Sequence, residues 1–428
     1  MMLSGRKQFV GGMSGALAIA LALVGGAGAC GGGGGGGGGT SPIGGAGAGG
    51  GGSNLSQRPA AAVPLYDEGR VHELALTMSA DDWQSIIGDS RGDEWRHASV
   101  TYDGVVVDDV GVRPAGESSR FAGNQKMSIR IKFDAFDGHG KFGGYGDVNV
   151  KGEYDDGSMM RERLAFFVFG TFMPAPKAAH TTLTVNGDAR GLFTLREDWD
   201  ETSISEHFSQ PVGPLYRIRG PAFPADPYAY LSDDPASYVP LPWERHIKMT
   251  AAGDEVVPAF LKALPDYSKL EQFVDVDNLL AYLVAAEIVM TTDGLIGSTG
   301  ASDHFQYYDP KSGKFFVLPW DPDNTFGSQD EMANKSIYSK LGRNSLTIVV
   351  RDRPDLTDAY IKKLTDGLVA LPLEMVQAKA DAIYAQIKDA AHADTIKTTS
   401  NDSFDWGLTD VKGFAASRYA DLHMQLGN

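Results

Sequence analysis

The sequence contains very little cysteine and has a deficit of positive charge. Cys30 is the only cysteine in 428 residues, so the chain forms no internal disulfide and its stability has to come from packing. The 55 acidic residues outnumber the 38 basic ones, which gives a formal charge of −17. Because phosphate backbones require a positive protein surface, we do not expect nucleic acid as a partner.

The signatures of several common enzyme classes are also missing. The sequence has no G-x-S-x-G elbow, no H-E-x-x-H pair, no paired cysteines and no Walker A loop. Gly138 to Gly143 does match G-x-G-x-x-G. It precedes a strand pattern instead of opening a helix, which excludes a dinucleotide site. Two interpretations remain for it, a flexible hairpin connection or a glycine-rich flap over phosphates.

The N-terminus has the pattern of an export signal. Arg6 and Lys7 precede a mostly apolar stretch, and Ala27-Gly28-Ala29 stands directly before Cys30. These small residues fit signal peptidase cleavage of a secreted protein, and the lone Cys30 after them fits a lipoprotein site. We expect residues 1–30 to be an export signal and Cys30 to be lipidated. The protein would then be an exported lipoprotein of the cell envelope or cell surface, with secretion as the alternative.

Residues 31–62 are mostly Gly, with Ala, Ser and Pro and almost no large side chains. Such a segment cannot bury enough apolar surface to order itself, so we expect a flexible linker. A folded domain is therefore expected over residues 63–428.

Hydrophobic patterns divide this domain into a β-rich part and a mainly helical part. Strand patterns and two hairpins dominate residues 63–266, and apolar helices with one further hairpin dominate residues 267–428. We therefore predict an α+β fold with two lobes, and ligands commonly bind between lobes of this kind. The expected elements are strands at 71–78, 98–107, 110–113, 127–133, 147–151, 181–185, 191–196, 215–219, 305–308 and 314–318, and helices from 80, at 159–172 and 271–290, and three after 355, the last at 411–426.

Basic side chains gather on the strand patterns of the first lobe. Lys126, Arg130 and Lys132 alternate with Met127, Ile129, Ile131 and Phe133, which predicts a half-buried strand with a basic outer row. A solvated strand face is the simpler interpretation. Phosphate binding is the other, because this basic cluster lies in a strongly acidic protein. Three more residues could contribute to it: Arg113, Arg120 and Lys151.

Up to three aspartates are expected to converge at one end of the last hairpin, and a fourth ends the preceding helix. Asp293 ends an apolar helix, Asp303 precedes the first hairpin strand, and Asp321 and Asp323 follow the second. Magnesium takes few carboxylates together with phosphate oxygens, and a further carboxylate could accept a proton. The alternative is that Asp-Pro-Asp-Asn only forms a turn.

Six segments, in order, resemble the CotH kinase family of spore-coat proteins. The most specific is FFVLPWDPDNTFG at 315–327, which is similar to the family's P-W-D-x-D-x-x-x-G. The resemblance spans about residues 110–425. The other segments are AGESSR and KMSIRIKFD (115–134), VNVKGEYDDGSMMRERLAF (148–166), VNGDARGLFTLRED (185–198), GPLYRIRG (213–220) and FAASRYADL (414–422).

The resemblance implies an atypical protein kinase-like fold that uses ATP and Mg²⁺ to phosphorylate Ser or Thr of a protein substrate. Asp321 matches the metal-binding aspartate, with Asp323 beside it, and either Asp303 or Asp293 would be the catalytic acid or base. Arg217 stands where the family usually has Lys. The nucleotide would be contacted by Lys126, Arg130, Lys132, Lys151, Arg161 or Glu162, and Glu197.

Two other functions remain open at this point. The same fold could be a non-catalytic binding or assembly module at the surface, since ATP is scarce outside the cytoplasm. A D-x-D glycosyltransferase would also place two aspartates on a metal, and it predicts a doubly wound α/β region at the N-terminal side.

Overall fold

The computed structural model describes residues 64–427, except 89–92, 117–118, 122, 137–139, 221–225, 248–249, 299 and 331. The predicted export signal with Cys30, the linker and part of the G-x-G-x-x-G segment lie outside the described residues. Within the described ranges, no helix has both the length and the apolar character needed to cross a membrane.

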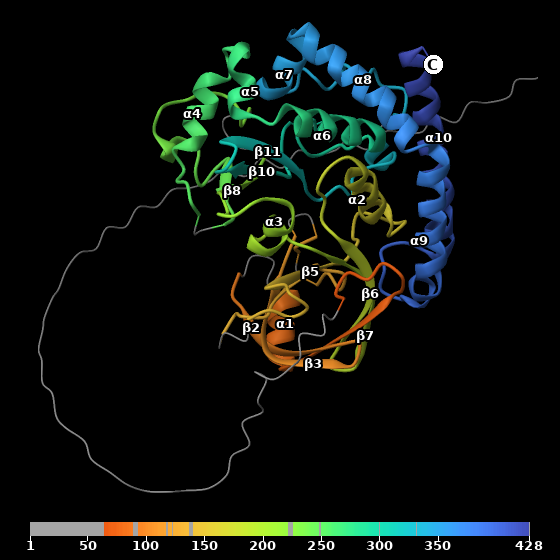
Figure 1. Cartoon of the computed structure of the whole chain (residues 1–428). Helices are drawn as coiled ribbons and strands as arrows, with labels where there is room; N and C mark the ends of the chain where they lie inside the picture. The colour runs from red at the N-terminus through yellow and green to blue at the C-terminus, as the bar shows by residue number, and fades with distance from the viewer. Residues whose placement is uncertain are drawn as a thin grey trace, which may run out of the picture. The chain divides into compact units, whose positions relative to one another are not determined.

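Seven strands between residues 72 and 196 close into a barrel (Figure 1). Neighbouring strands are antiparallel, except that β1 and β6 pair in parallel and complete the closure. The order around the barrel is β1 (His72–Met78), β2 (Arg96–Tyr102), β3 (Val105–Pro114), β4 (Ile129–Lys132), β5 (Asp147–Lys151), β7 (Asp188–Arg196) and β6 (Ala178–Val185).

The period-two pattern of the sequence explains which side chains fill this barrel. Alternate residues such as Ile129, Ile131, Val148 and Val150 are buried together in its core, as a strand with one apolar face requires. The residues between them face outward. Arg130, Asn149 and Arg196 are register partners on β4, β5 and β7 and form a polar row on the outside.

A second sheet and most of the helices form the rest of the structure. The sheet has the order β11 (Lys314–Pro319), β10 (His304–Asp309), β8 (Leu215–Ile218) and β9 (Trp243–Arg245), so it joins strands from either side of residue 266. Helix α6 is buried on nearly all sides and packs against β11, α2 and α8. Helices α9 and α10 lie side by side next to α2, and α9 contacts β7 (Figure 1).

The helices have the following bounds: α1 (Ala80–Gly88), α2 (Arg161–Phe172), α3 (Glu201–His207), α4 (Val256–Ala263), α5 (Leu270–Phe273), α6 (Val276–Val289), α7 (Ser345–Asp352), α8 (Pro354–Ala370), α9 (Leu373–Ala393) and α10 (Asn401–Leu426).

The predicted α+β class is confirmed, as are the hairpins around residues 186 and 312. The doubly wound sheet expected of a glycosyltransferase is not what the described residues form.

One predicted helix, Glu271 to Met290, is wrong because two helices occupy that range. Val274 leaves the helix to form a bridge with Phe315, and the amide of Asp275 donates to the carbonyl of Phe315. The Asp275 side chain then caps α6 by accepting from the amide of Asn278. The last helix also begins earlier than predicted, at Asn401, where Ser400 provides the cap.

Candidate functional site

The site begins where β5 leads into helix α2. Lys151 is the last residue of β5, and Glu162 lies in the first turn of α2. Gly152 between them is obligatory, because a Cβ there would lie 1.8 Å from the carbonyl oxygen of Lys126. Asp156 fixes the start of α2 by accepting from the amides of Met160 (2.9 Å) and Arg161 (2.8 Å). The connection therefore sets the position of Glu162 relative to Lys151.

The second part of the site is the turn that follows β11. Asp321 has a φ of +51°, in the left-handed region that few non-glycine residues adopt. The turn is held by Thr325, whose hydroxyl donates to the carbonyl of Pro322 (3.0 Å), and by the buried ring of Phe326. Gly327 packs so closely on Phe414 that a Cβ would come within 2.6 Å of the ring. These contacts aim Asp321 and Asp323 toward α2.

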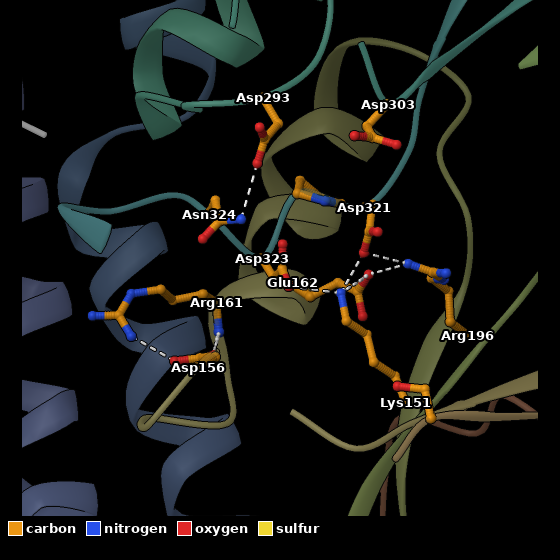
Figure 2. A network of polar contacts seen from close by, with 12 residues as sticks. Lys151, Asp156, Arg161, Glu162, Arg196, Asp293, Asp303, Asp321, Asp323 and Asn324 are labelled. Atoms are coloured by element: carbon orange, nitrogen blue, oxygen red, sulfur yellow. Dashed lines mark hydrogen bonds and ion pairs between the residues drawn. The ribbon is translucent and has the colours of Figure 1, made fainter. Parts of the chain in front are cut away.

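Five charged side chains from four elements meet here, as Figure 2 shows with dashed lines for several of the pairs. The Lys151 ammonium contacts Oδ1 of Asp321, Oδ2 of Asp323 (2.9 Å) and Oε1 of Glu162 (3.3 Å). Arg196 donates to Oε1 of Glu162 (2.7 Å) and to Oδ1 of Asp321 (2.7 Å). The cluster joins the barrel, α2 and the turn after β11 in one ion network.

The two aspartates of the turn differ in their electrostatic surroundings. Burial would raise the pKa of Asp321, but Lys151 and then Arg196 outweigh it and hold that pKa far below its usual value. Burial raises the pKa of Asp323 to about 7, although Lys151 opposes the shift. The pKa of Lys151 is raised, because the three carboxylates together exceed the cost of its burial. Asp321 is therefore the firmly ionised member of the pair.

Asp293 and Asp303 lie beside this cluster but have different partners. The Asn324 amide donates to Oδ2 of Asp293 (2.9 Å), so this aspartate is tied to the turn that carries Asp321 (Figure 2). Burial raises the pKa of Asp293, and the charges of Asp303 and Asp321 add to the shift. Asp303 has a φ of +44° and forms an ion pair with Arg217 (2.6 Å).

Three other predicted residues, Lys126, Arg130 and Lys132, do not join the cluster. Lys126 is buried and pairs with Asp394 (2.9 Å) between the barrel and the connection after α9. Arg130 binds Asp147 (2.8 Å) and Asp198 (2.5 Å) on the outer row of the barrel, where burial raises the pKa of Asp147 to about 6. Lys132 is partly exposed and pairs with Asp134 (3.4 Å).

Arg161 and Glu197 are also placed outside the ion network. Arg161 pairs with Asp156 (2.5 Å) at the start of α2, and so supports the helix that carries Glu162. Glu197 is buried after β7, where it accepts from the amide of Lys177 (2.9 Å), and burial raises its pKa.

Two residues of the site were not predicted from the sequence. Arg196 precedes Glu197 in the L-R-E-D segment, so its place at the end of a hairpin strand was the available signal. Glu153 lies two residues after Lys151 and has a φ of +52°. Burial and then the charge of Glu162 raise the pKa of Glu153. Neither pattern reveals by itself which partner the side chain meets.

Strained backbone is concentrated around these side chains. Glu153, Met290, Asp303, Asp321 and Phe326 all have φ values between +44° and +53°. Such conformations cost of order 1–3 kcal/mol each and persist where the surroundings enforce them, often at functional sites. Within the described ranges, no three Asp, Glu, His or Cys side chains form a group suited to hold a metal ion.

Comparison with known proteins now identifies the family. The profile of the family described as CotH kinase protein matches residues 112–422. The chain belongs to the CotH family. All five members of the ion network lie within the matched range, so the resemblance predicted from the sequence is confirmed.

Two curated CotH relatives come from Bacillus subtilis (strain 168). The inner spore coat protein H is 25% identical over 284 residues, which cover 62% of this chain and 74% of that protein. The inner spore coat protein H-like protein is 26% identical over 173 residues, which cover 40% of this chain and 45% of that protein. The match to the second relative thus spans less than half of its length.

Proposed function

We propose that this CotH family protein is a kinase that transfers the γ-phosphate of ATP to Ser or Thr of a protein substrate. The observation that carries the proposal is the meeting of Lys151, Glu162 and Asp321 from three separate elements. Protein kinases require a strand lysine paired with a helix glutamate, together with an aspartate that holds magnesium. The barrel and the helical part then correspond to two lobes of a kinase-like fold, with Lys151 on the first and Asp321 on the second.

The donor set fits magnesium. Asp321 and Asp323 supply two carboxylates, and Mg²⁺ takes one or two carboxylates together with phosphate oxygens. The Lys151 ammonium already contacts both, which supports a cation in this place. When bound, Mg²⁺ would offset the negative charge on the phosphates of ATP. Among this chain's own residues, Lys151 contributes a positive charge to the phosphates, and Glu162 keeps that lysine in position.

Asp293 is our choice for the residue that accepts the proton of the attacking hydroxyl. Burial raises its pKa, which makes its carboxylate a stronger base than that of an exposed aspartate. Asn324 ties it to the Asp321 turn. Asp303 is instead paired with Arg217, and we assign it a supporting role.

Phosphoryl transfer by the full-length chain tests this function. Incubation with Mg²⁺, labelled ATP and Ser-rich peptides should label the peptide or the protein, and Asp321→Asn should remove the signal. The kinase assignment fails if the wild-type chain neither transfers phosphate nor gains melting temperature with nucleotide. If Asp321→Asn transfers as well as wild type, only the site assignment fails.

A non-catalytic surface module is the second candidate. Lys151 and Arg196 already neutralise Asp321, so the network is electrostatically satisfied by the protein itself. An exported location would also separate the protein from cytoplasmic ATP. This alternative predicts nucleotide binding without transfer, or neither, with wild-type and Asp321→Asn proteins behaving alike in assembly assays.

We propose an exported location, in line with the names of the two spore-coat relatives. Lipidation of Cys30 would anchor the protein to a membrane and make it an envelope or surface lipoprotein. Cys30→Ser should then release the protein from the membrane fraction. If its partitioning is unchanged, the lipid anchor is refuted and the secreted alternative is preferred.

A further inference from the structure

Two cations in the site bind the same pair of carboxylate oxygens. Arg196 Nη1 lies 2.7 Å from Oε1 of Glu162 and 2.7 Å from Oδ1 of Asp321. Lys151 Nζ lies 3.3 Å from the same Oε1 and also contacts the same Oδ1 (Figure 2). Glu162 and Asp321 are therefore each neutralised twice, once from β5 and once from β7.

The two cations differ in how firmly they are held. Arg196 ends β7 and is paired in register with Asn149 on β5 and Ala178 on β6. Its guanidinium lies 3.9 Å from the ring centroid of Trp320, which is itself buried. A planar guanidinium stacked on an aromatic ring is fixed in orientation, whereas a lysine ammonium is a point charge on a flexible chain.

This difference matters when an anion enters the site. If Lys151 alone linked Glu162 and Asp321, its movement toward a phosphate would weaken its hold on both and leave the buried Glu162 and the partly buried Asp321 short of positive charge. Leaving a buried charge without its partner is strongly unfavourable. Arg196 remains on both oxygens, so the same movement leaves each carboxylate with a partner.

We propose that Arg196 is a positioning residue that clamps Glu162 to Asp321 permanently and so releases Lys151 to bind the phosphates of the substrate. The identity of that anion rests on the proposed kinase function. The clamp itself rests only on the contacts of the ion network. It also means that α2 is held against the Asp321 turn before any ligand arrives.

Two single variants and their combination test the clamp. Lys151→Met and Arg196→Met each leave one cation on Glu162 and Asp321. Each should therefore moderately lower the urea midpoint, the urea concentration at which half of the protein is unfolded. The double variant removes both cations, and its midpoint should fall by clearly more than the sum of the two single losses. Additive losses would overturn the shared clamp.

Nucleotide binding separates positioning from mere support of the fold. With Mg²⁺ and ADP in isothermal titration, Arg196→Met should raise Kd about tenfold, because Lys151 is then retained by the carboxylates. Arg196→Lys restores the charge but not the planar group stacked on Trp320, so its Kd should lie between those of wild type and Arg196→Met. In the transfer assay, Arg196→Met should lower kcat as well as raise the KM for ATP, since Asp321 loses its fixed orientation.

The control variant is Arg245→Met on β9, which removes an arginine that is more exposed than Arg196 (21% against 9% of the side chain) and is paired with Asp254 (2.7 Å). It should change the urea midpoint without changing Kd. The proposal is overturned if Arg196→Met binds Mg²⁺ and ADP like wild type, or if Arg245→Met weakens binding equally. If the wild-type protein binds no nucleotide, the kinase function fails, and the urea cycle alone then decides the clamp.

Discussion

At the scale of single residues, the site depends on the backbone conformation of Asp321 as much as on its charge. Its φ of +51° places the carboxylate next to Lys151 and Arg196 directly after a buried strand. Asn and Asp tolerate this region far better than other non-glycine residues do, because their short polar side chains bond locally. The residue type is therefore constrained twice, once by geometry and once by chemistry.

Substitution of Asp321 should separate these two constraints. Asp321→Asn keeps the tolerated backbone, and Asp321→Val does not, so the valine variant should unfold with about 1–3 kcal/mol less free energy than the asparagine variant. Both should lose phosphoryl transfer by about 100-fold or more, because the ionised carboxylate is gone. Urea unfolding and a transfer assay measure the two effects. Equal stability of the two variants would contradict the backbone argument.

The roles of Asp293 and Asp303 can be distinguished by the same kind of substitution. Asp293→Asn removes the proposed proton acceptor and should lower kcat by about 100-fold to 10,000-fold. Asp303→Asn breaks only a partly exposed ion pair with Arg217, so kcat should stay within about tenfold of wild type. Steady-state kinetics with saturating peptide measure both. The reverse order of effects would assign the proton acceptor to Asp303.

At the scale of elements, the connection between α9 and α10 forms hydrogen bonds with the barrel and with the connection between β5 and α2. The connection after α9 contributes Asp394, which accepts from the amide of Leu192 (3.0 Å) and from Lys126 (2.9 Å). Thr398 donates to the carbonyl of Tyr154 (3.1 Å) within the β5–α2 connection itself. The connection between α9 and α10 thus contacts β7, which carries Arg196, and the segment that leads from Lys151 to α2.

Lys126→Met should show how much the ion pair between Lys126 and Asp394 contributes to stability. The change leaves the fully buried Asp394 without its cation, which should lower the free energy of unfolding by about 3–5 kcal/mol. The pair Lys126→Met with Asp394→Asn removes both charges and should be less unstable than Lys126→Met alone. Urea unfolding at neutral pH provides the comparison. A double variant as unstable as the sum of both changes would argue against an ion pair.

At the scale of the whole molecule, two buried histidines limit stability in acid. Burial lowers the pKa of His180 to about 3 and that of His304 to about 4. His180 Nε2 donates to the carbonyl of Met159 (2.7 Å), so Nδ1 accepts from Arg163 (3.0 Å). Protonation would set two cations against each other. The folded state therefore keeps this imidazole neutral, while the unfolded chain takes up a proton near its usual pKa.

The folded and unfolded states differ in whether His180 binds a proton, and this difference sets how stability changes with pH. Between pH 7 and pH 5 the unfolded chain gains a proton at position 180 and the folded protein does not, so stability falls as pH falls. Protonation of His180 in the unfolded chain lowers the free energy of unfolding by about 2 kcal/mol between pH 7 and pH 5. His180→Gln can make both hydrogen bonds without titrating, so its stability difference between pH 7 and pH 5 should differ from wild type by that amount. Equal pH dependence in urea unfolding would refute the neutral histidine.

The sequence by itself determined much of the local structure. Period-two alternation placed most strands, Asn186-Gly187 and Ser312-Gly313 marked two hairpins, and P-W-D-P-D-N-T-F-G pointed to Asp321 and Asp323. These features are local because side-chain period, turn preference and a short motif need only neighbouring residues. The break between α5 and α6 was missed because Val274 leaves the helix for a distant strand.

Only the tertiary structure decided which charges meet. Lys126 and Lys151 look alike as basic residues beside barrel strands, yet one is buried against Asp394 and the other enters the ion network. Arg196 gains its role from Trp320, Glu162 and Asp321, which lie 34 or more residues away along the chain. A pairing of this kind depends on barrel closure and on the packing of α2, and no local pattern encodes either. The sequence therefore specifies the carboxylates, and the fold selects their cations.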